Sequence, residues 1–159
     1  MQDTFFEIAP ADGVAEVAAV AALFRAYAAA LPVDIGYQGF AAELAGLPGA
    51  YASPAGALLL ARDGAGEAIG CIGMRPLGDG ICEMKRLYVA PAGRGMGLGL
   101  ALAQAFLAEA ARAGYREARL DTLPSMAPAL ALYRRLGFEP MAAYNVTPFA
   151  ETIFMRLAL

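Results

Sequence analysis

The segment VAPAGRGMGLGLAL, residues 89–102, carries the residues with the clearest chemical potential. It has four glycines between Gly93 and Gly99, a single arginine, Arg94, and no acid. Backbone amides of a glycine-rich turn that opens a helix can hold phosphate groups at the positive end of the helix dipole, and a guanidinium adds a forked donor for a pyrophosphate. A loop that simply needs several positive φ angles would show the same glycines, so the cluster alone leaves both interpretations open.

Two phosphate-binding patterns are absent from this segment. GxxxxGK[ST] fails because no lysine follows any of these glycines, and GxGxxG lacks its third glycine in each register. Asp121 nevertheless lies where a dinucleotide-binding fold would place its ribose-binding acid. A small dinucleotide-binding protein therefore stays as an alternative.

The absence of histidine restricts the acid–base chemistry of this chain. It excludes Ser-His-Asp and Cys-His arrangements and the usual zinc sites, so we expect no metal. Any proton transfer must come from Tyr, Glu, Asp, Cys or Lys85, which is the only lysine. Cys71 and Cys82 lie in strand-like segments without metal-ligand spacing, which predicts reduced core or sheet residues.

Length and charge exclude several classes of protein. A chain of 159 residues predicts a single domain, 1–159. No apolar run approaches the roughly 18 residues of a membrane span, and a net charge of −3 with scattered basic residues argues against nucleic-acid binding. The N-terminal MQDTFFE lacks the basic region of a secretory signal, so we expect a cytoplasmic protein with neither membrane nor nucleic acid as partner.

Periodicity and turn residues predict the elements that must position these groups. Strands are expected over 5–10, 56–63, 67–77, 81–91, 117–123, 139–144 and 152–159. Helices are expected over 13–31, 36–47, 97–114 and 126–136. The three strands within 56–91 should form an antiparallel meander, and the strand 117–123, which returns after a helix, should pair in parallel with 81–91.

The pattern R-x-x-G-x-G from Arg94 to Gly99, directly after a strand, resembles the GNAT acetyltransferases, whose signature is [Q/R]-x-x-G-x-[G/A]. EMKRLYVAPAGRGMGLG is similar to the family's strand 4 and pyrophosphate loop, and ALALYRRLGFEP to its last helix and following strand. The resemblance implies one GNAT domain, 1–159, with an α/β fold of the α+β type: a central, mixed, mostly antiparallel sheet of about seven strands with helices on both faces.

The resemblance also implies acetyl-CoA as co-substrate and a set of residues that hold it. Leu87, Tyr88 and Val89 would lie beside the pantetheine arm, where the strands 81–91 and 117–123 splay apart. The pyrophosphate loop and first helical turn would be formed by Arg94, Gly95, Met96, Gly97, Leu98, Gly99 and Leu100. Many relatives carry an asparagine where this chain has Met126, which puts cofactor affinity in doubt.

Two residues match the family's catalytic positions. Tyr133 would be the general acid that protonates the departing thiolate, and a core tyrosine is the structural alternative. Glu83 would be the base that deprotonates the amine, the alternative being a sheet glutamate that pairs with Lys85 or Arg86. Asp121 is a fallback base or substrate anchor.

The resemblance therefore predicts an acetyl-CoA-dependent N-acetyltransferase that transfers an acetyl group directly to a primary amine of a small molecule, amino acid or peptide. The acceptor should bind near residues 31–40 and 144–149. A catalytically silent acyl-CoA-binding sensor module is an alternative, and a homodimer, common in the family, is left open.

Overall fold

A computed structural model describes residues 5–159. The first four residues of the predicted domain and of the MQDTFFE stretch lie outside the described part. The strands are β1 Phe6–Pro10, β2 Ala57–Asp63, β3 Ala68–Gly78, β4 Ile81–Val89, β5 Glu117–Thr122, β6 Glu139–Met141 and β7 Ile153–Ala158. The helices are α1 Val14–Ala30, α2 Phe40–Ala45, α3 Leu98–Arg112 and α4 Ala127–Arg135, with 3₁₀ turns at Gly36–Gln38, Gly49–Tyr51 and Pro91–Gly93.

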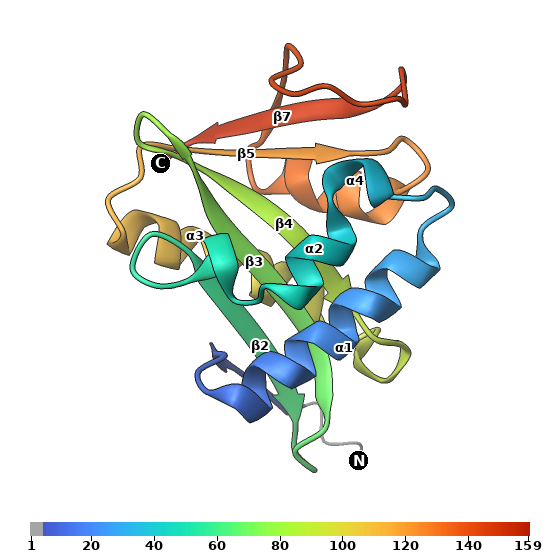
Figure 1. Cartoon of the computed structure of the whole chain (residues 1–159), viewed down its shortest axis with the longest axis vertical. Coiled ribbons are helices and arrows are strands. Elements are labelled where there is room, and N and C mark those ends of the chain that lie inside the picture. The colour runs from blue at the N-terminus through green and yellow to red at the C-terminus, as the bar shows by residue number, and fades with distance from the viewer. Residues whose placement is uncertain (1–4) are drawn as a thin grey trace.

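The described strands form one sheet in the order β1-β2-β3-β4-β5-β7-β6 (Figure 1). The β4–β5 pair is parallel, whereas the other neighbours run antiparallel. This confirms the predicted mixed, mostly antiparallel seven-stranded sheet. It also confirms the meander of β2 to β4 and the parallel return of β5.

Helices cover both faces of the sheet. Leu58 and Leu60 of β2 are buried in the core beneath α1, and the alternate residues Leu59 and Ala61 are buried in the core beneath α3 and α4. The alternation follows from the two-residue repeat of a strand. In Figure 1, α1 and α2 lie in front of the sheet and α3 lies behind it. None of the helices in residues 5–159 combines the length and apolar character needed to cross a bilayer.

Two predicted elements differ from the observed ones. The helix expected over 36–47 is interrupted at Gly39, whose φ of 73° is left-handed, so only a 3₁₀ turn and the short α2 form. The strand expected over 139–144 ends at Met141. The chain then leaves the sheet, and Tyr144 instead places its hydroxyl 2.6 Å from a carboxylate oxygen of Glu83.

The sheet is split along the β4–β5 boundary. Only Ile81–Glu83 pairs with Glu117–Arg119, so the remaining parts of the two strands are not hydrogen-bonded to each other. The predicted splay is therefore confirmed, and Figure 1 shows β4 and β5 diverging beyond their paired ends. A gap between two otherwise buried strands exposes backbone groups that a ligand can engage.

A β-bulge in β4 lies at the edge of this gap. Cys71 pairs with Tyr88 and Gly73 with Lys85, so two residues of β4 oppose the single residue between them on β3. Arg86 occupies the bulge with a φ of 61°, which is uncommon for a residue with a Cβ. Bulges bend a strand and re-aim its residues, and this one redirects the last residues of β4.

Candidate active site

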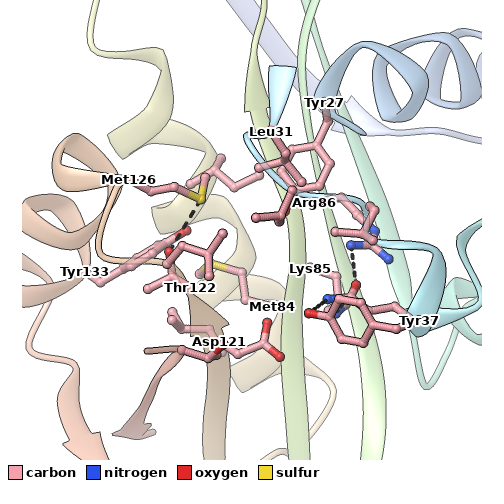
Figure 2. Close-up of a pocket in the computed structure, with 17 residues that line it drawn as sticks. Tyr27, Leu31, Tyr37, Met84, Lys85, Arg86, Asp121, Thr122, Met126 and Tyr133 are labelled. Carbon is pink, nitrogen blue, oxygen red and sulfur yellow. Dashed lines mark hydrogen bonds between the residues drawn. The ribbon is translucent and has the colours of Figure 1, made fainter. Parts of the chain in front are cut away.

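A small pocket occupies the gap between the diverging strands. It encloses about 50 Å³ and is lined by β4 from Met84 to Leu87 and by β5 from Leu120 to Thr122. Its other walls come from α1, from the segment that follows α1, and from α4 with the residue before it; Figure 2 shows Tyr27, Tyr37, Met126 and Tyr133 around the pocket. The further lining residues are Tyr27, Leu31, Val33, Ile35, Tyr37, Gln38, Leu123, Met126, Tyr133 and Thr152. The predicted acceptor region at 31–40 therefore contributes to the pocket.

A larger cleft of about 450 Å³ adjoins this pocket. Four residues line both spaces: Tyr27, Leu31, Leu87 and Met126. The remaining lining residues of the cleft are Ala30, Pro32, Tyr88, Val89, Arg94 and Ser125. The three predicted pantetheine contacts and Arg94 are thus brought together along one channel that leads to the pocket.

The glycine-rich loop reaches the wall of the cleft through Arg94, and the loop fits a phosphate group. Gly95 and Gly97 have φ angles of 80° and 77°, and no atom lies within 4 Å of where a Cβ would stand, so space is open above the backbone. Arg94 is exposed and forms no ion pair with any residue in 5–159. The loop also leads into the N-terminus of the 15-residue α3. The Arg94 guanidinium donates one long hydrogen bond, of 3.4 Å, from Nε to the Val89 carbonyl oxygen. A guanidinium without a carboxylate partner, beside the amides at a helix N-terminus, suits a pyrophosphate.

The residues of the loop contribute in different ways. Met96, Gly99 and Leu100 are half-buried in the loop and the first turn of α3. Leu98 has its side chain in the core, with 1% of its surface exposed. It can therefore offer a phosphate only its backbone amide.

Tyr133 projects from α4 into the pocket (Figure 2). The residue is 7% exposed, and its ring packs edge-on against Phe138. Burial raises the pKa of the phenol above its ordinary value of about 10, and the nearby Asp121 raises the pKa further. The hydroxyl therefore stays protonated at neutral pH, which is the state that a proton donor needs.

Glu83 is fully buried but does not line the pocket. Its carboxylate accepts hydrogen bonds from Arg75 Nε at 2.7 Å and from the Tyr144 hydroxyl at 2.6 Å. The alternative expected from sequence, a pair with Lys85 or Arg86, was wrong, because Arg75 is the residue opposite Glu83 in the β3–β4 register. Glu83 thus lies beneath the pocket wall, with both oxygens engaged.

Arg86 has its charge matched within the protein. Its guanidinium donates two hydrogen bonds of 3.0 Å to the Glu43 carboxylate and a third, of 2.7 Å, to Gln38 Oε1. It also lies over the rings of Tyr27 and Phe40. This network fixes the bulge of β4 against α1 and α2.

Lys85 and Asp121 are charged residues of the pocket wall that the sequence did not identify as the main catalytic candidates. Lys85 is 5% exposed and donates to Gln38 Oε1 at 3.2 Å. Asp121 accepts a hydrogen bond of 3.0 Å from Asn145 through one carboxylate oxygen. One feature of the sequence could have indicated Lys85. It is the only lysine of the chain, and it lies in the middle of a predicted strand among mostly apolar residues.

Cys71 and Cys82 are free and buried, and neither lines the pocket or the cleft. Burial raises the pKa of the Cys82 thiol to about 12, so almost no thiolate forms at neutral pH. Within residues 5–159, no three His, Cys, Asp or Glu side chains gather as metal ligands would.

The fold, the divided sheet and the loop before α3 are those of an acyl-CoA-dependent transferase domain. The model of the Acetyltransferase (GNAT) family matches residues 20–138. An uncharacterized N-acetyltransferase of Schizosaccharomyces pombe is 38% identical over 138 residues, which cover 86% of this chain and 85% of the relative. The chain belongs to the GNAT acetyltransferase family, whose co-substrate is acetyl-CoA.

Solved structures agree with this assignment. The putative acyl-CoA N-acyltransferase of Klebsiella pneumoniae superposes with a TM-score of 0.76 at 28% identity and covers 99% of both chains. The putative acetyltransferase yncA of Salmonella typhimurium, solved with acetyl-CoA, shares the fold with a TM-score of 0.68 at 24% identity, and the match covers 96% of this chain and 93% of that one. A dinucleotide-binding protein, the alternative left by Asp121, is not supported, since the strands described in residues 5–159 include one parallel pair and five antiparallel pairs.

Proposed function

We propose that the protein is an N-acetyltransferase that moves an acetyl group from acetyl-CoA directly to a primary amine. The acceptor is a small molecule, an amino acid or a peptide. One observation carries the proposal: a small pocket between the diverging strands adjoins the cleft beside Leu87–Val89, and Tyr133 lines that pocket. An acceptor in the pocket and a thioester in the cleft would thus meet within reach of a buried phenol.

The proposed co-substrate contacts follow the walls of the cleft. Leu87, Tyr88 and Val89 would lie along the pantetheine arm, where the end of β4 has no partner in β5. The pyrophosphate would be held by the loop and first helical turn formed by Arg94, Gly95, Met96, Gly97, Leu98, Gly99 and Leu100. Two features support this assignment: Arg94 is exposed and has no ion-pair partner within residues 5–159, and the space above the backbone at Gly95 is open.

Tyr133 is the proposed general acid. Acetyl-CoA supplies an acetyl group as a thioester, whose carbon–sulfur bond breaks as a carbon–nitrogen bond forms. Tyr133 would donate its phenolic proton to the departing thiolate, and the surplus proton of the attacking amine leaves through the base. A phenol in an apolar pocket stays protonated until the thiolate forms.

Glu83 is the proposed base, acting through intervening water. Its carboxylate lies beneath the pocket wall, with Arg75 and Tyr144 as partners, so direct contact with an acceptor amine is not its route. Asp121 lines the pocket and is the second candidate for this role.

Direct transfer is supported by what lines the two spaces. Cys71 and Cys82 lie outside both, so neither thiol is available to carry the acetyl group as an enzyme-bound thioester. The acceptor amine itself is therefore the proposed nucleophile.

Calorimetric titration with acetyl-CoA, and in parallel with NAD and NADH, tests the proposal. We expect binding of acetyl-CoA alone, followed by thiol release when a panel of primary amines is added. Tight binding without thiol release from any amine would favour the silent acyl-CoA-binding module. Binding of NAD or NADH without binding of acetyl-CoA would contradict the proposal that acetyl-CoA is the co-substrate.

A further inference from the structure

Lys85 is a buried lysine that forms no ion pair with any residue in 5–159. Its side chain lies in the pocket wall, 5% exposed, and its ammonium has one hydrogen-bond acceptor, Gln38 Oε1, among residues 5–159. No carboxylate in that part of the chain forms an ion pair with it. A buried charge costs free energy unless it is paired. The desolvated ammonium therefore favours any ligand that brings a negative charge into the pocket.

The neighbouring charges do not meet this need. Arg86 is satisfied by Glu43, and Glu83 by Arg75 and Tyr144. The charges of Arg86 and Glu83 are therefore already neutralised by protein groups when no ligand is bound. Of the two cations that line the pocket, Arg86 is paired with a carboxylate, whereas Lys85 has no carboxylate partner within residues 5–159.

Asp121 supplies the opposite charge across the gap. It extends from β5 toward β4, facing the strand that carries Lys85 (Figure 2). Asn145 binds only its Oδ2, so Oδ1 is free of protein donors within the described chain. Asp121 and Lys85 line the same pocket without forming an ion pair with each other. The pocket therefore presents a separated pair of opposite charges.

We propose that the acceptor is a zwitterionic amino acid whose carboxylate binds Lys85 and whose ammonium group is drawn toward Asp121. This inference rests on the proposed acetyl transfer and names its substrate class. Lys85 and Asp121 line one small pocket of about 50 Å³, so the carboxylate and the amine that they would bind belong to one small molecule. A polyamine or an amine without a carboxylate would leave Lys85 unpaired.

The charge pair also distinguishes substrate from product. Acetylation converts the ammonium group into a neutral amide but leaves the carboxylate intact. The attraction to Asp121 is then lost, whereas the contact with Lys85 remains. The pocket should therefore bind the acetylated product more weakly than the free amino acid, because the product has no charge to attract Asp121.

Matched acceptors test this inference without any mutation. The standard L-amino acids and their carboxamides are compared as pairs, because each pair differs in the carboxylate. Thiol release from acetyl-CoA gives kcat/KM, and calorimetry against the protein saturated with CoA gives binding. For the best pair we expect the acid to exceed the amide by about 10- to 100-fold in both measurements, as for a hydrogen bond to a charged group.

Variants locate the preference at Lys85. Lys85→Met keeps length without charge and should reduce the acid-to-amide ratio to near one, mainly through KM. Lys85→Arg should retain part of it. Arg112→Met, on the exposed end of α3, makes the same change in net charge and should keep the wild-type ratio.

Each outcome decides the inference. Equal use of acids and amides by the wild-type protein would overturn it, as would failure of every amino acid to bind or react. An equal fall for acid and amide in Lys85→Met would remove Lys85 from carboxylate recognition. If acetyl-CoA binds and no acceptor releases thiol, the proposed acetyl transfer is wrong. The ratio of the Kd values of the acids and their carboxamides then still tests whether Lys85 and Asp121 bind a zwitterion.

Discussion

The Tyr133 hydroxyl has no hydrogen-bond partner among the residues described, although its ring is well packed. A hydroxyl left free at the wall of a pocket is available to a ligand. At the scale of single residues, this is the feature that most directly connects the structure with chemistry.

Replacing Tyr133 by Phe should lower kcat by about 100-fold or more, the usual contribution of a general acid, with little change in the Kd of acetyl-CoA. Steady-state kinetics and calorimetry give the two values. Because burial raises the pKa of this phenol above 10, any alkaline fall in rate below pH 10 must come from another group. An unchanged kcat would remove Tyr133 from the mechanism.

Glu83→Gln tests both the base and the structure beneath the pocket. It neutralises the carboxylate while Arg75, a third exposed, keeps its charge, so we expect a loss of about 1–3 kcal/mol in the free energy of urea unfolding. If Glu83 is the base, the acidic limb of the pH–rate profile should also change.

Tyr144→Phe is the matched control for this change. It removes one hydrogen bond to Glu83 but leaves the carboxylate charged. A similar pH–rate profile for wild type, Glu83→Gln and Tyr144→Phe would assign Glu83 a structural role only.

Residue pairs of this kind were beyond sequence reasoning for a geometric reason. Arg75 faces Glu83 because of the β3–β4 register, and Tyr144 reaches Glu83 from 61 residues away. A short sequence pattern gives information on neither of these contacts, because both join residues that are far apart in the chain or paired only through the sheet. Tyr133 and Arg94, in contrast, were predicted because each lies in a short contiguous motif.

Among the elements, the loop between β4 and α3 combines two kinds of glycine. Gly97 caps α3 with a φ of 77°, whereas Gly99 lies within the first helical turn. Only the first needs the backbone freedom of glycine. Residues two apart in one motif should therefore respond differently to the same substitution.

Gly97→Ala should lower the free energy of unfolding by about 1–2 kcal/mol, because a Cβ strains a left-handed residue. It should also weaken acetyl-CoA binding. Gly99→Ala should leave stability unchanged or raise it by up to about 1 kcal/mol, since its Cβ would meet only ordinary contacts at 3.8 Å and 3.9 Å. Urea unfolding and calorimetry compare the two variants, and equal losses of stability would contradict this distinction.

Elements with strong periodicity were predicted closely from sequence, and weakly patterned ones were not. The helix expected over 97–114 is α3, Leu98–Arg112, whose apolar residues pack on the sheet. The helix expected over 36–47 was not found as one unit because Gly39 adopts a left-handed conformation. Short segments depend on tertiary contacts more than on their own pattern.

For the molecule as a whole, the narrow junction between β4 and β5 joins two parts of the sheet, β1–β4 and β5–β7–β6. A ligand lying in that gap would contact both parts. Its binding should therefore stabilise the entire fold and not just the loop that it touches.

Acetyl-CoA at about 100 times its Kd should stabilise the protein by about 2.7 kcal/mol, which corresponds to a rise in Tm of about 5–10 °C for a chain of this size. Thermal unfolding monitored by circular dichroism measures the shift. Arg94→Gln should reduce the shift at the same ligand concentration with little change in Tm in the absence of ligand, because Arg94 is exposed and makes only a long hydrogen bond, of 3.4 Å, to the Val89 carbonyl. A shift equal to that of the wild type would argue against a pyrophosphate contact.

The burial of Lys85 has a consequence for chemical modification. This residue holds the only lysine amine in the chain, and it is 5% exposed. Spontaneously acylating thioesters, amine-directed cross-linkers and fluorescent succinimidyl esters modify side chains at accessible lysines, and the folded surface offers almost no lysine amine. In peptide mapping after long incubation with acetyl-CoA, a lysine acetyl group can appear at one position only, and that position lies in the wall of the pocket between β4 and β5.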